Sequence, residues 1–62
     1  MTARDYKLIT KCLGLAMRYA TGSDEQRAIN NCIEHFIIEL RAENPRFDEE
    51  MFRRAIDATA RW

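Results

Sequence analysis

The chain is poor in loop-forming residues, with two glycines and one proline among 62 residues. It also lacks net charge, because ten basic and ten acidic residues cancel. This balance argues against a general affinity for nucleic acid or anionic membranes, since both depend on a positive field. No apolar run approaches the ~18 residues of a membrane span, and no signal-peptide pattern opens the sequence. We therefore expect a cytoplasmic protein whose two cysteines stay reduced.

What remains is the composition of a single globular domain over residues 1–62. Hydrophobic residues make up 47% of the chain and charged residues 32%, which is not the composition of a disordered protein. A domain of this size buries only about 60% of its unfolded surface. Its stability is then a few kcal/mol at best, unless a disulfide, a metal or a partner chain adds to it.

Apolar residues recur at spacings of three and four along three segments, which is the helical signature. The pattern predicts an all-α, compact three-helix bundle with helices at about residues 3–20, 24–43 and 49–60. Short connections separate them, with Gly22 expected to cap the end of the first helix and Pro45 to stop the second.

The helix starts carry capping residues. Thr2 is placed to cap the first helix, and Ser23 with Gln26 predicts a capping box on the second. Asp48 is expected to cap the third helix. Phe47 and Phe52 flank it at the spacing of a hydrophobic staple, which fixes the angle at which the chain enters the helix.

The first helix is apolar over an arc of roughly 200°. This is wider than a helix packed on two neighbours in a small bundle needs. Either the third helix wraps further than usual or another chain covers the surplus, and we expect a homodimer. The residues assigned to this dimer or partner face are Leu8, Leu15, Met17 and Tyr19.

Cysteine and histidine chemistry gives no site. Cys12 and Cys32 lie on apolar helix faces and are expected to be small core residues. Cys32 and His35 have the spacing of two metal ligands, but a structural zinc site needs a second close pair. His35 is the only histidine, yet three surface helices form no obvious pocket for a general base. We predict neither a metal nor a cofactor, and no enzymatic activity.

Charge is unevenly distributed along the chain. Residues 1–22 hold four basic groups and one acid, whereas residues 23–43 hold five acids and two basic groups. The basic side chains share one face of the first helix over ~20 Å, with Gly14 in the same row, and could follow a phosphate backbone. They are Arg4, Lys7, Lys11 and Arg18. A helix-turn-helix is disfavoured, because three carboxylates begin the third helix where base contacts would be made.

Both ends of the chain carry short motifs that can be compared with those of known proteins. Residues 43–48 read ENPRFD and are followed by Phe52 and Ala55, and this pattern resembles the C-terminal part of small, largely uncharacterised phage and prophage proteins. Residues 1–6 read MTARDY, with Leu8 and Ile9 after them, and resemble their opening. The resemblance implies a helical fold, a phage origin and the host cytoplasm as location, but no known activity.

A short, phage-like helical protein without a catalytic constellation is interpreted as an interaction module. We expect it to bind and inhibit or redirect a host protein, such as an antiviral defence complex, in an anti-CRISPR-like or other anti-defence role. Interface energy concentrates in aromatic and arginine anchors, and the candidates are Tyr19, Ile38, Arg54 and Trp62. Two alternatives stay open: an accessory nucleic-acid-binding protein that uses the basic side chains of the first helix, and a structural phage component.

Overall fold

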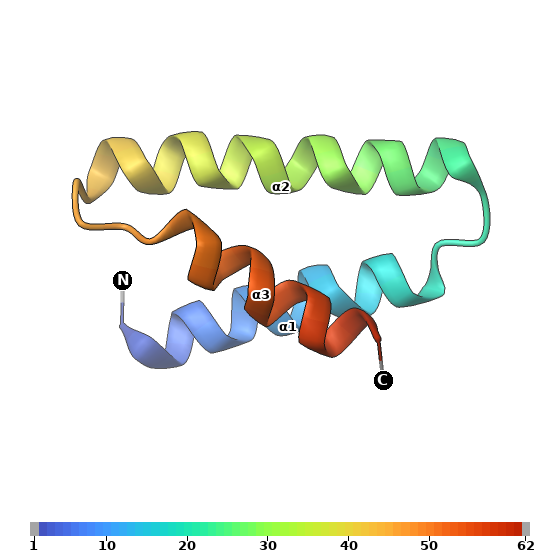
Figure 1. Ribbon diagram of the computed structural model, residues 1–62, viewed down its shortest axis with the longest axis horizontal. Helices are drawn as coiled ribbons and strands as arrows, with labels where there is room; N and C mark the ends of the chain where they lie inside the picture. Colours follow the sequence, from blue (N-terminus) through green and yellow to red (C-terminus); the bar gives the residue numbers. More distant parts are fainter. Residues whose placement is uncertain (1, 62) are drawn as a thin grey trace.

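The protein is a bundle of three helices, and this confirms the predicted fold class. The computed structural model describes residues 2–61. In it α1 spans Ala3–Tyr19, α2 spans Ser23–Glu43 and α3 spans Glu49–Ala60. Figure 1 shows α1 and α2 as an antiparallel hairpin, with α3 crossing in front of it and packing mainly on α1. Within residues 2–61 no helix is long and apolar enough to cross a membrane.

The caps of α1 and α3 are formed as predicted. The Thr2 hydroxyl accepts the Asp5 N–H at 3.2 Å, and the Asp5 carboxylate accepts the Thr2 N–H at 3.4 Å, which makes a complete capping box. The Asp48 carboxylate accepts the Met51 N–H at 3.0 Å. Each bond satisfies a backbone donor that the first helical turn leaves free, and so fixes where the helix begins.

The staple is also confirmed, and it leads into the core. The rings of Phe47 and Phe52 meet edge to face with centroids 5.3 Å apart, and Tyr6 of α1 meets Phe52 in the same way at 5.8 Å. Phe52 is fully buried, with 0% of its surface exposed. The buried hydrophobic cluster consists of Ile33, Ile37, Phe52 and Ile56.

The α1–α2 connection differs from the prediction. The N-cap of α2 is Gly22, Ser23 is already helical, and no side chain caps this end. A capping side chain has to come from the N-cap residue, whose backbone is extended. Ser23 follows the N-cap by one residue and therefore cannot cap the helix. Gly22 does not end α1 either, because α1 is capped at Ala20, and the φ of Gly22 is −119° rather than left-handed.

Gly14 lies in line with the basic side chains of α1, but unlike them it is not exposed. Gly14 is buried where α1 crosses α3, and a Cβ added to it would lie 2.4 Å from the Thr59 Cβ and 2.8 Å from the Ile56 carbonyl oxygen. Thr10, one turn earlier, is also buried, and its hydroxyl donates to the Tyr6 and Lys7 carbonyls. The two helices therefore approach closely along a line of small residues.

Candidate protein-interaction surface

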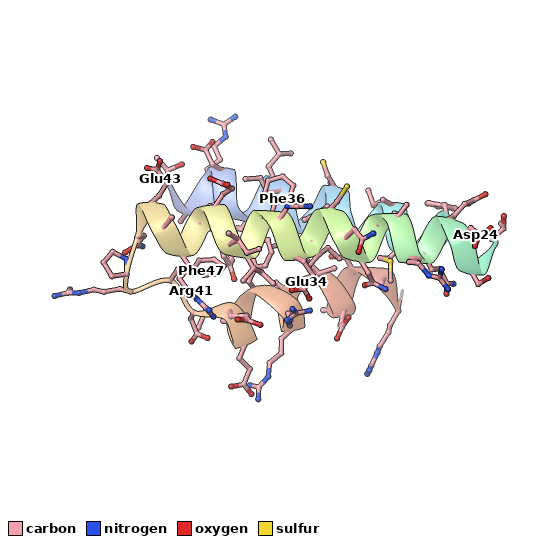
Figure 2. The ribbon with its side chains drawn as sticks, turned by 90° about the horizontal axis from the view of Figure 1, so that it is seen from above. Asp24, Glu34, Phe36, Arg41, Glu43 and Phe47 are labelled. Carbon is pink, nitrogen blue, oxygen red and sulfur yellow. The ribbon has the colours of Figure 1, made fainter. Side chains whose placement is uncertain are left out.

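Ion pairs tie one flank of α2 to α3. Arg53 of α3 pairs with Glu34 of α2 and, at 3.0 Å, with Glu49 on its own helix, while Arg41 of α2 also pairs with Glu49. The hydrogen bond from Arg53 lowers the pKa of Glu49, and it outweighs the opposing effect of desolvation. Figure 2 shows Glu34 and Arg41 on the α3 side of α2. Among the described residues, the opposite flank of α2 forms no ion pair with α3.

Residues two positions away point to that opposite flank, because two residues turn a helix by about 200°. On α2, Cys32 and Phe36 each lie two positions from Glu34, and Figure 2 shows Phe36 on the side away from α3. On α1, Leu8 precedes Thr10 by two positions, and Cys12 precedes Gly14 by two. Both sets therefore face away from α3, on the same side of the α1–α2 hairpin.

We call this surface the apolar strip. On α1 its residues are separated by four, three and four positions, the heptad spacing of a helix that packs along another helix. Leu8 and Tyr19 are 60% and 71% exposed, and Phe36 is 37% exposed. Around Phe36 the surface forms a shallow, almost wholly apolar hollow that His35 and Glu39 help to line. The apolar strip comprises Leu8, Cys12, Leu15 and Tyr19 of α1 with Cys32 and Phe36 of α2.

Charged rows of opposite sign accompany the apolar strip: the basic row lies beside it on α1, whereas the acidic row shares the exposed face of α2 with Cys32 and Phe36. The outer edge of α1 carries a basic row made of Arg4, Lys7, Lys11 and Arg18, all exposed. The exposed side of α2 carries an acidic row made of Glu25, Glu39 and Glu43. Among residues 2–61 no member of either row forms an ion pair. The Arg18 guanidinium lies 5.7 Å from the centre of the Tyr19 ring, a cation–π contact that joins the basic row to the strip.

The four predicted anchors do not form one surface. Tyr19 belongs to the apolar strip, but Ile38, 60% exposed, lies about 160° round α2 from Phe36. Arg54 is on α3 and pairs with Glu50 at 2.6 Å. Trp62 lies outside the described residues. Of the predicted dimer or partner face, Leu8 and Tyr19 are exposed and Leu15 is half-buried, whereas Met17 packs against the core.

The two cysteines were expected in the core, and this is wrong. Cys12 and Cys32 are free and exposed, and Met51 is 60% exposed. Phe36 also reaches the surface. The heptad spacing from Leu8 to Tyr19 was the available signal for a second packing surface on α1. On α2 the corresponding signal for a second packing surface was limited to Cys32 and Phe36, which lie one helical turn apart.

A second concave region lies at the end of the bundle where α1 begins and α2 ends. This cleft, of about 460 Å³, is lined by Thr2, Ala3 and Tyr6 together with Leu40, Glu43 and Asp48, among others. The Tyr6 hydroxyl is buried, and no group within residues 2–61 hydrogen-bonds to it. Burial raises the pKa of Tyr6, and the Asp48 carboxylate adds to the effect.

Neither a metal centre nor a known relative gives a further assignment. Over the described range, 2–61, no group of three or more histidine, cysteine or acidic side chains is arranged to hold a metal ion. Protein-family models, curated proteins and solved structures were compared with the chain, and none of them matches it. The apolar strip with its two charged rows is therefore the surface from which function has to be inferred.

Proposed function

We propose that this chain is a small, non-catalytic interaction protein that binds a host protein through the apolar strip and inhibits or redirects it. The observation that supports the proposal is the exposure of Leu8, Tyr19 and Phe36 on one side of the α1–α2 hairpin. The resemblance to phage proteins favours a host target, with antiviral defence components as the first class to test.

The strip has the character of a helix-packing surface. Burying a leucine or phenylalanine side chain contributes about 1.5–3 kcal/mol relative to leaving it exposed. Because the strip lies on helices that are already folded, binding orders side chains but no backbone, and this keeps the entropic cost low. A partner that presents an apolar helix or groove fits such a surface.

The test is affinity capture of host proteins on the immobilised chain, followed by binding measurements with the purified candidate. Phe36→Glu should weaken binding of the identified partner at least about thirty-fold, as expected for an interface anchor. Ile38→Glu is the matched control, because it also adds a carboxylate to an exposed position of α2, on the other flank. Equal loss in both variants, or in neither, would contradict the proposal.

Nucleic-acid binding is the second candidate, and the basic row supports it. Arg4, Lys7, Lys11 and Arg18 follow one edge of α1 over roughly 21 Å and have no ion-pair partner among residues 2–61. Binding through them would weaken steeply as salt rises. Lys7→Glu combined with Lys11→Glu should abolish it while leaving protein binding through the strip largely intact. Salt-independent binding to DNA or RNA would rule this candidate out.

A further inference from the structure

We propose that a second copy of this chain covers the apolar strip, face to face, about a twofold axis parallel to α1 and α2. The inference rests on the proposed function, because it names one partner for the same surface. Since a host protein would need the strip as well, self-association and target binding would compete, and the dimer would have to open before the target binds.

The two charged rows select this arrangement. Identical faces can meet about an axis that runs either across the helices or along them. An axis across the helices would set the basic row against the basic row, and like charges would repel. An axis along the helices sets α1 of one copy on α2 of the other, so that the basic row faces the acidic row. Complementary charges of this kind fix the orientation and register of an interface.

The position of each residue along the helix axes then determines which side chains of the two copies meet. The end cleft brings Ala3 and Tyr6 beside Leu40 and Glu43, and residues 20–22 join the helices at the other end. Because both helices rise 1.5 Å per residue, counting inward from both ends sets residue 8 level with residue 36, and residue 12 with residue 32.

A twofold axis along the helices preserves these levels. Leu8 of one copy therefore meets Phe36 of the other, and Cys12 meets Cys32 of the other. Near one end Arg4 faces Glu39 and Glu43, and near the other Arg18 faces Glu25. Each helix of the hairpin then has antiparallel neighbours, as in an up-and-down four-helix bundle.

The size of the face suits a dimer. The Cα envelope measures 34 × 20 × 16 Å, and the hairpin occupies its broad side, 34 Å by 20 Å or about 680 Å² (Figure 1). A standard interface buries about 800 Å² per partner. Within residues 2–61 only four hydrophobic side chains are buried, so a second copy would supply burial that a chain of this length lacks.

Thiol cross-linking tests the arrangement. Cys12→Ser and Cys32→Ser are each treated with a short bis-maleimide, separately and after mixing and equilibration. Each variant keeps one cysteine, so no cross-link can form within a chain. We expect a covalent dimer in the mixture and almost none in either variant alone, because only unlike cysteines meet. Cross-linking in a single variant as strong as in the mixture, or none in the mixture, would overturn the arrangement.

Sedimentation equilibrium at micromolar concentration tests the dimer itself. The parent and Ile38→Glu should have the dimer mass, whereas Leu8→Glu and Phe36→Glu should dimerise at least about thirty-fold more weakly. Circular dichroism verifies that each variant is folded. A monomeric parent would overturn the dimer and leave host binding untouched. A dimeric parent that captures no host protein would instead overturn the proposed function alone.

Discussion

Gly14→Ala is expected to destabilise the fold, although alanine is the better helix former. The new Cβ would lie 2.4 Å from the Cβ of Thr59 and 2.8 Å from the carbonyl oxygen of Ile56. Neither atom can rotate away, because one is a backbone atom and the other is bonded directly to the backbone. Relief requires α3 to shift as a body, and that shift would disturb Phe52 and Ile56 in the core.

Two opposing contributions set the change in the free energy of unfolding that Gly14→Ala causes. Replacing glycine by alanine inside a helix gains about 1 kcal/mol of helix propensity. Overpacking a close contact costs typically 1–3 kcal/mol, and a clash with fixed atoms belongs at the upper end. We therefore expect a net loss of about 2 kcal/mol, equivalent to a fall in Tm of roughly 8–16 °C in a domain of this size. This is a large share of the few kcal/mol available to 62 residues.

Urea unfolding followed by far-UV circular dichroism measures the change. Gly22→Ala is the control, because nothing lies within 4 Å of its added Cβ. It should stay within about 0.5 kcal/mol of the parent, since a stiffer unfolded chain offsets a poorer N-cap. Thr59→Gly removes both Thr59 atoms that the new Cβ would meet and leaves the Ile56 carbonyl, so it should recover part of the loss in a double-mutant cycle with Gly14→Ala. A Gly14→Ala protein as stable as the parent would refute the close-contact explanation.

Three further predictions concern polar groups. Asp48→Ala should cost about 1 kcal/mol in urea unfolding, because the Met51 N–H loses its acceptor, whereas Asp48→Asn should retain most of the stability. Tyr6→Phe should raise stability by about 1 kcal/mol by removing a buried hydroxyl that has no hydrogen-bond partner among residues 2–61, and a loss of stability would contradict this. Arg53 lowers the pKa of Glu49, so the carboxylate stabilises the fold above the ordinary glutamate pKa and stops doing so as pH falls through the lowered one. The parent should accordingly be more stable than Glu49→Gln at neutral pH, with the difference vanishing in acid.

The features predicted correctly from the sequence are local. A cap or a staple depends on residues three or four positions apart, as with Thr2 and Asp5 or Phe47 and Phe52, so their spacing contains the information. The burial of Gly14 depends instead on its contact with Thr59, which is 45 positions away in the sequence. The spacing of apolar residues does not reveal this contact, because glycine has no side chain that counts as apolar or polar. The α1–α3 crossing could therefore not be located from the pattern of apolar residues.

The exposed cysteines and Phe36 have a related explanation. An apolar arc shows which residues can be buried, but not which part of the arc a neighbour covers. Cys12 and Cys32 lie within apolar arcs, yet the neighbouring helix covers the other part of each arc. Only the position of α3, fixed by Gly14 on α1 and by the Glu34–Arg53 ion pair on α2, separates the covered side from the exposed side.

The lengths of the helices explain why one side remains uncovered. At 1.5 Å per residue, the 12 residues of α3 span about 18 Å, whereas the 21 residues of α2 span about 32 Å. The short helix α3 crosses one side of the α1–α2 hairpin at an angle and leaves the other side of the hairpin uncovered (Figure 1). The hairpin nevertheless carries apolar side chains on both sides, and on the side away from α3 those of α1 follow a heptad. This spacing is that of a helix face that can pack along another helix, and Leu8, Cys12 and Tyr19 of this face are exposed. The proposed interface with another helix pair would bury this surplus on α1.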